Sequence, residues 1–301
     1  MNPVNMYTLS NALLKIAVNP IGAELCRIAS VKNKNEFMWD ANPDIWGSFA
    51  PNLFPIIGTL KNEEYIYKNE TYTLPKHGFI RHSKDIKCIS QTSTSLIFSL
   101  KHNKKLLEWY PFKFEFLITY TLHSNALEIL YTIKNLDKQT IYFSVGGHPA
   151  FKCPLYAGEK YSDYSLVFEK EEISKSYLLN KKNGLLTDQT KAVFDTPKNI
   201  TLKPDLFNND ALILKDLASR SVALVSKNNG EILTVSFKEY QYLGLWAKPN
   251  AHFVCIEPWL GITDHENTTK QLIEKEGIIA LPIDESFDAS YTIQIHESHL
   301  A

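Results

Sequence analysis

The sequence is short of arginine, of positive or negative excess charge, and of long apolar stretches. Only Arg27, Arg81 and Arg220 stand among its 32 basic residues, so bidentate phosphate clamps are scarce. The formal net charge of −1 argues against nucleic acid or an anionic membrane as a partner. No stretch approaches the ~20 apolar residues of a membrane span, and Met1–Met6 lacks the features of a secretory signal. We therefore expect a cytoplasmic protein.

Clustered metal ligands are also lacking. The four cysteines lie far apart in mainly apolar contexts, which favours buried thiols of a reduced protein over disulfides or a zinc set. The nine histidines include no H-x-H or H-E-x-x-H spacing. Neither a G-x-S-x-G elbow nor a glycine-rich phosphate loop is present, so acyl-transfer and nucleotide chemistry have no motif. We predict no metal site.

Alternation of apolar and polar residues is the dominant pattern, and it predicts strands. The predicted strands cover 112–122, 127–133, 141–145, 222–226, 232–237, 253–256 and 291–295. Asn229-Gly230 supplies a hairpin turn. Only Thr268–Glu276 has a modest helical pattern, and the Lys-, Asn- and Asp-rich region 156–210 favours long connections. Without βαβ alternation, linker or repeat, the pattern predicts one all-β domain over 1–301: a large antiparallel β-sandwich, less than about a fifth helical.

Glu257 is the most informative single residue. It follows the apolar strand predicted at Phe253–Ile256, and Pro258, which has no N–H, is expected to end that strand. Trp246 and Trp259 lie nearby in the sequence. A carboxylate at the rim of a core is suited to act as a general base with a raised pKa.

Three further loops combine polar residues with glycine or proline: Ala50–Leu60, His77–His82 and Gly146–Lys152. They present Asn52, Arg81 and the two histidines His77 and His148. Two imidazoles and the Glu257 carboxylate are the usual parts of a paired acid/base site. Spacing alone leaves a second possibility open, because Asp210 and Glu257 could be the two carboxylates of a glycosidase.

Taken together, these segments resemble the aldose 1-epimerase (galactose mutarotase-like) family, in particular its LacX-like branch. The resemblance covers most of the chain in order, and the matching segments are Gly22–Leu25, Ala50–Leu60, His77–Arg81, Gly147–Phe151, Asn209–Ile213 and Gly244–Asp264. It implies a β-supersandwich and a cofactor-free isomerase that interconverts α and β anomers of a hexose.

The resemblance also implies roles. Glu257 corresponds to the base that takes the proton of the anomeric hydroxyl, and His148 to the acid that protonates the ring oxygen. His77 would orient the same region, and Asp210 would bind sugar hydroxyls. Trp246 and Trp259 could stack on the sugar ring or serve as core aromatics, and Asn52, Arg81 and Lys248 are further candidate binding residues.

One position departs from the family pattern. Well-studied galactose mutarotases carry an arginine where this chain has Thr59, so the preferred sugar stays open, with Arg81 or Lys248 as substitute donors. A hexose-phosphate 1-epimerase is an alternative, with Lys61, Arg81, Lys152 and Lys248 as candidate phosphate contacts. A non-catalytic sugar-binding sandwich is another. The expected partner is a small sugar, phosphorylated or not, and the expected state a monomer or weak homodimer.

Overall fold

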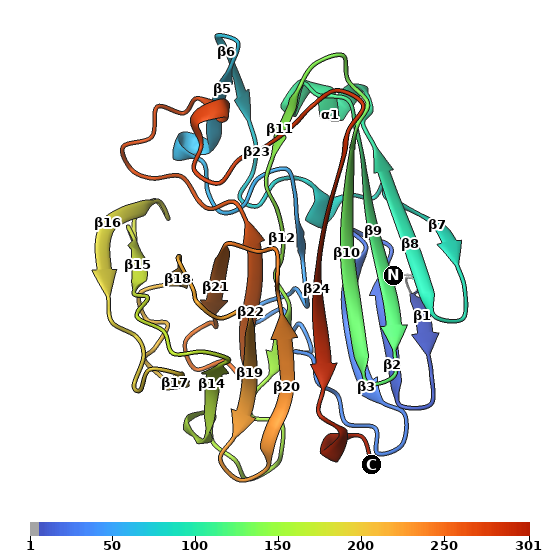
Figure 1. Cartoon of the computed structure of the whole chain (residues 1–301), viewed down its shortest axis with the longest axis vertical. Coiled ribbons are helices and arrows are strands. Elements are labelled where there is room, and N and C mark those ends of the chain that lie inside the picture. The colour runs from blue at the N-terminus through green and yellow to red at the C-terminus, as the bar shows by residue number, and fades with distance from the viewer. Residues whose placement is uncertain (1–5) are drawn as a thin grey trace.

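A computed structural model describes residues 6–301 of the chain. The expectation that Met1–Met6 carries no secretory signal lies almost wholly outside these residues. Among them, no helix has the length and apolar character needed to cross a membrane. The regular secondary structure of the described chain is mostly antiparallel β-sheet, with 7% of the chain helical, which confirms the all-β prediction (Figure 1).

The larger of the two main sheets has nine strands, and its ladders are antiparallel. In sheet order the strands are β17 (Asn199–Thr201), β14 (Tyr164–Phe168), β19 (Ser221–Ser226), β20 (Gly230–Ser236), β24 (Ser286–Ile295), β10 (Ala126–Asn135), β9 (Phe114–His123), β8 (Ser95–Lys101) and β7 (Lys87–Gln91). Strands β9 and β10 alternate between buried and half-buried residues along their whole length. The period of two seen in the sequence therefore places one face of this sheet on the core.

The second main sheet has eight strands, most of them short. Its order is β16 (Leu186–Lys191), β15 (Ser176–Leu179), β18 (Leu212–Leu214), β21 (Tyr242–Trp246), β22 (Phe253–Leu260), β12 (Val145–Gly147) and β4 (Asn52–Leu53), and β13 (Ala150–Lys152) also pairs with β22. The region 156–210, expected to hold long connections, supplies four short strands to the two sheets: β14, β15, β16 and β17. One hydrophobic core joins residues of both sheets.

Smaller elements surround the two sheets. They are the three-stranded sheet β1 (Tyr7–Ser10), β2 (Leu14–Asn19) and β3 (Glu24–Ser30), the hairpin β5 (Glu64–Tyr67) and β6 (Glu70–Thr73), and the pair β11 (Ile141–Phe143) and β23 (Ile279–Leu281). The 3-10 turns are η1 (Lys61–Glu63), η2 (Ile80–His82), η3 (Tyr161–Asp163), η4 (Leu272–Glu274) and η5 (Glu297–His299).

The helical prediction at Thr268–Glu276 was wrong in extent, because only the single turn η4 forms there. The α-helix of the described chain is α1 (Lys104–Trp109), which the sequence analysis missed. Asn103 caps it by accepting the Leu106 N–H at 2.9 Å, a common way to satisfy a free donor at a helix start. The asparagine before Lys104-Lys-Leu-Leu was the sequence signal from which this helix could have been predicted.

Candidate active site

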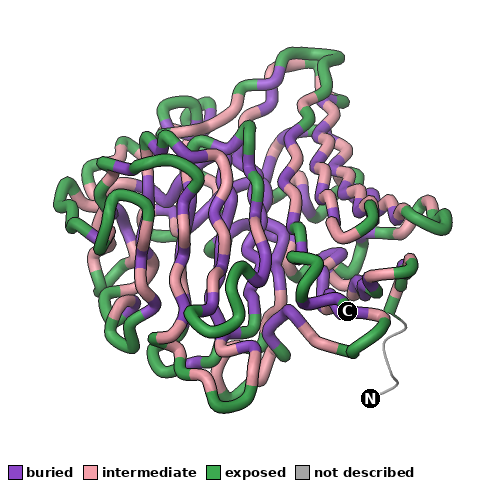
Figure 2. The backbone as a smooth tube through the Cα atoms, turned by 60° about the horizontal axis from the view of Figure 1, so that its bottom comes forward, coloured by how far each residue is buried: buried purple, intermediate pink, exposed green. Residues whose placement is uncertain are grey.

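Strand β22 carries Glu257 into the interior. All eight of its residues are buried, so both of its faces are covered, whereas β9 and β10 have one half-buried face. In Figure 2 the buried segments run through the middle of the molecule, and the exposed ones lie mainly at its edge. The prediction that Pro258 ends the strand was wrong, because β22 continues to Leu260. The Ile256 N–H donates to Pro149 O, so the Pro258 nitrogen, two residues later, faces the same neighbour. The neighbouring segment makes its turn between β12 and β13 beside Pro258. A residue without a backbone N–H is tolerated at such an interruption of the ladder.

His148 lies in the turn between β12 and β13. Its N–H donates to Pro51 O at 3.1 Å. The preceding Gly147 is tightly packed, since a Cβ there would come within 2.5 Å of the Tyr291 hydroxyl oxygen. This backbone places His148 Nε2 3.2 Å from Glu257 Oε2, with the two side chains 10% and 1% exposed. The imidazole and the carboxylate, 109 positions apart in sequence, thus form one contact.

His77 completes the set of titratable groups. Its backbone has φ of 66° and the following Gly78 has φ of 72°, a turn that brings the ring next to His148 with centroids 5.7 Å apart. The Gly58 N–H donates to His77 Nδ1 at 3.1 Å. Because Nδ1 accepts, the neutral ring carries its proton on Nε2.

Burial is the main influence on the protonation of these groups. It lowers the pKa of His148 to about 3, with Arg81 acting in the same sense. Burial, with His148 as the next cause, lowers the pKa of His77 well below its usual range. Burial raises the pKa of Glu257 well above its usual range, although Lys76 opposes the shift. Burial therefore shifts all three groups toward their neutral forms.

These side chains line a cavity of about 380 Å³, a volume typical of small-molecule sites. The structure also brings five of the other predicted residues to this cavity, whose lining includes Asp210, Arg81, Lys248, Trp246 and Trp259. Asp210 has φ of 76°, and its Oδ1 accepts the N–H of the next residue, Ala211, at 2.8 Å. Thr59, where the family arginine is absent, also faces the cavity.

Trp46 and Lys76 are among the lining residues that the sequence analysis missed. The Trp46 ring stacks on His148, with centroids 5.1 Å apart and planes 28° apart, and Lys76 directly precedes His77. A lysine next to a candidate catalytic histidine was a usable signal for Lys76. Trp46 had none, because its loop meets His148 only through the tertiary fold.

Asn52 does not line this cavity. It is 1% exposed, donates to Gly22 O and Ala23 O at 2.9 and 3.0 Å, and accepts from the Tyr131 hydroxyl at 2.7 Å. The binding role of Asn52 stays a prediction, and in this structure its polar atoms are used inside the core. Lys61 and Lys152, candidate phosphate contacts, are not among the lining residues either.

One group of potential metal ligands is present in the described part of the chain. It consists of His148, Cys255 and Glu257, whose ligand atoms lie within 4.8 Å of one another. Burial, with Glu257 as a further cause, raises the pKa of the Cys255 thiol well above its usual range. A thiolate is the form that binds zinc, so burial favours the form of this cysteine that does not bind zinc.

Comparison with known proteins shows the family of the chain. The family model for aldose 1-epimerase matches residues 5–271. The chain belongs to the aldose 1-epimerase family. It is 36% identical to the plasmid-encoded protein LacX of Lactococcus lactis subsp. lactis, over 95% of this chain and 98% of that protein, and equally similar to the chromosomal form. Membership of the aldose 1-epimerase family supports an isomerase of the mutarotase type that acts on a sugar.

Solved structures place the fold in the same family. A galactose mutarotase related enzyme from Lactobacillus acidophilus is 35% identical and superposes with a TM-score of 0.89, covering 97% of both chains. A galactose mutarotase-like protein from Lactobacillus casei, 24% identical, has a TM-score of 0.90 over 97% of this chain and 100% of that one. The predicted galactose mutarotase-like β-sandwich is therefore confirmed.

Proposed function

We propose that this protein is an aldose 1-epimerase that interconverts the α and β anomers of a hexose by opening and closing the sugar ring. The observation that carries the proposal is the 3.2 Å contact of His148 Nε2 with Glu257 Oε2 in the cavity lining. An imidazole and a carboxylate that reach one bound molecule can deliver and remove protons together. The reaction needs no cofactor. The four cysteines are free, which fits a reducing, cytoplasmic environment.

In the ring-opening step, Glu257 takes the proton of the C1 hydroxyl while His148 delivers a proton to the ring oxygen. The bond between C1 and the ring oxygen breaks, and C1 becomes the aldehyde carbon. After rotation about the C1–C2 bond, the C5 hydroxyl attacks the other face of the aldehyde. Its proton returns to His148, and the C1 oxygen regains a proton from Glu257, so the enzyme ends in its starting state.

This cycle requires one proton on the His148–Glu257 pair. Burial lowers the pKa of His148 and raises that of Glu257, so in the free protein the proton rests on the carboxyl. Its transfer across the 3.2 Å contact produces the carboxylate base and the imidazolium acid. His77, with its proton on Nε2, is then a hydrogen-bond donor to the reacting oxygens.

The remaining lining residues are suited to hold the sugar. Asp210 can accept hydrogen bonds from hydroxyl groups, and Trp246 is a candidate for stacking on a pyranose. A second candidate, a hexose-phosphate 1-epimerase, is favoured by one observation. Three cationic side chains, Lys76, Arg81 and Lys248, line the same cavity, enough positive charge to bind a phosphate.

Exchange NMR on glucose, galactose and their phosphorylated forms tests both candidates. Glu257→Gln keeps the shape of the side chain but removes the base, so anomerisation should fall by about 10²–10⁴-fold. Sugar affinity, measured by calorimetry, should change by less than about threefold, because the proton transfer is made only in the transition state. The same split between turnover and binding is expected for His148→Asn.

Glu172→Gln is a matched control. Glu172 is also buried, at 6% exposure, but it accepts the N–H groups of Ala218 and Ser219 and does not line the cavity. Its substitution should leave anomerisation per folded molecule unchanged. Sugar binding by the wild type without anomerisation would instead identify a binding module, and an active Glu257→Gln variant would remove Glu257 as the base.

A further inference from the structure

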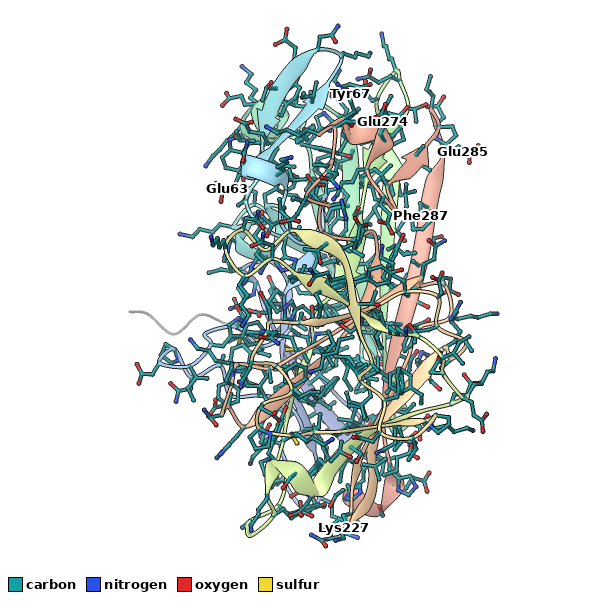
Figure 3. The ribbon with its side chains drawn as sticks, turned by 90° about the vertical axis from the view of Figure 1, so that its left-hand side faces the viewer. Glu63, Tyr67, Lys227, Glu274, Glu285 and Phe287 are labelled. Carbon is teal, nitrogen blue, oxygen red and sulfur yellow. The ribbon has the colours of Figure 1, made fainter. Side chains whose placement is uncertain are left out.

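A buried ion pair lies outside the cavity. Lys275 Nζ and Asp264 Oδ1 are 2.6 Å apart, and the two side chains are 4% and 3% exposed. Lys275 follows η4, which packs beside the β5–β6 hairpin; Figure 3 shows Glu274 and Tyr67 near the same end of the molecule. Neither partner is among the residues that line the cavity. Burying two charges is unfavourable unless their other polar atoms also find partners.

Asp264 and its neighbour Thr263 bind the loop Gly58–Lys61. The second carboxylate oxygen of Asp264 accepts the Lys61 N–H at 2.9 Å, and the Asp264 N–H donates to Thr59 O at 2.9 Å. Thr263 Oγ1 accepts the Thr59 N–H at 3.0 Å. The ion pair with Lys275 therefore fixes a carboxylate that is itself bonded to the loop.

The same loop holds His77 by two hydrogen bonds. Gly58 O accepts the His77 N–H at 2.9 Å, and the Gly58 N–H donates to His77 Nδ1 at 3.1 Å. Gly58 lies tightly against Thr263, since a Cβ on it would come within 2.3 Å of the Thr263 Cβ. A shift of the loop would consequently move the donor that determines which nitrogen of His77 carries the proton.

We propose that Asp264 and Lys275 are positioning residues for His77: they clamp the loop Gly58–Lys61, and through Gly58 they keep His77 Nε2–H directed to the cavity as a donor. The clamp acts on geometry alone and touches no substrate. Its kinetic consequence rests on the proposed anomerisation, whereas its effect on the His77 tautomer does not. Small displacements of a catalytic group can lower turnover by about 10²-fold.

Two double variants separate the clamp from general stability. Asp264→Leu with Lys275→Met replaces the ion pair by apolar groups, which is often tolerated by the fold, but it removes the acceptor for the Lys61 N–H. Asp264→Asn with Lys275→Met also removes both charges yet keeps an oxygen acceptor. We expect the first to lower kcat by at least about tenfold with KM changed less than about threefold, and the second to recover most of the turnover.

Nitrogen NMR of the histidine rings gives a readout that does not depend on activity. In the wild type and the Asn/Met variant, His77 should show a proton on Nε2; in the Leu/Met variant, the Nδ1–H form should appear. Lys215→Met is the control, because it breaks an ion pair with Glu276, the neighbour of Lys275, at 2.7 Å without touching the loop. It should change neither kcat nor the His77 signals.

The proposal is overturned if the folded Leu/Met variant keeps both the wild-type turnover and the Nε2–H form of His77. Should that variant not fold, Thr263→Val, which removes the acceptor of the Thr59 N–H, decides by the same NMR signals: an unchanged tautomer overturns the clamp. A wild-type protein without anomerase activity would defeat the proposed function, but the tautomer measurement would still test the clamp.

Discussion

The two main sheets differ in how continuous their strand pairing is and in whether they carry the candidate catalytic pair. In the nine-stranded sheet, β9 and β10 pair over ten residues each without a register shift, from Ala126 opposite His123 to Asn135 opposite Phe114. In the eight-stranded sheet, β22 faces two short strands on one side, β12 and β13, separated by the turn that carries His148. The candidate catalytic pair lies at this interruption.

The difference follows from which backbone groups the strand pairing in each sheet leaves unpaired. A continuous ladder uses its backbone groups in pairing and directs alternate side chains to core and solvent. An interrupted ladder leaves strand ends with unpaired backbone groups. At this interruption His148 contacts Glu257 of the neighbouring β22, and both side chains stay buried. The burial that shifts their pKa values thus comes with the fully buried strand β22 and the turn beside it.

A core substitution in the regular sheet is expected to give the largest effect on stability. Ile129 in β10 is 0% exposed, so Ile129→Ala should lower the free energy of unfolding by about 2–5 kcal/mol. Because β10 lines no part of the cavity, kcat of the folded fraction should stay within about threefold of wild type. Urea denaturation and exchange NMR measure the two quantities. A selective loss of kcat without destabilisation would break the division between scaffold and site.

Asn52 tests the boundary between the two regions, since it lies in β4 of the interrupted sheet but bonds to Tyr131 of β10. Asn52→Ala leaves these buried partners unsatisfied, so stability should fall by about 1–3 kcal/mol. KM for the sugar should change by less than about threefold, because Asn52 does not reach the cavity. A large rise in KM at unchanged stability would support the substrate-binding role predicted from sequence.

The pH profile carries the smallest expected change. A second proton should enter the His148–Glu257 pair only as the pH falls toward the lowered pKa of His148, about 3. From pH ~7 to ~5, kcat/KM should therefore stay nearly flat, whereas an exposed histidine titrates near ~6.5. Activity should decline at high pH, as the pair loses its single proton at the raised pKa of Glu257. A fall centred near pH ~6.5 would show that the site is more hydrated than its burial indicates.

Much of the fold could be predicted because the strands of the nine-stranded sheet show a local alternation of apolar and polar residues. The predicted strand at 112–122 became β9, and the Asn229-Gly230 turn joins β19 to β20. Prediction failed where neighbours override local rules: Pro258 stays within a strand because the adjacent ladder is interrupted, and Thr268–Glu276 forms a single turn.

The sequence by itself determined the chemistry available to the protein: its strand pattern, the histidines, the carboxylates and the glycine- and proline-rich segments that hold them. Only the tertiary structure decided which of them meet. It brings His77, His148, Asp210 and Glu257 to one cavity, adds Trp46 and Lys76, and keeps Asn52 in the core. The physical reason is that local patterns specify which face a side chain takes, whereas proximity, burial and hence pKa depend on which strands pair across the fold.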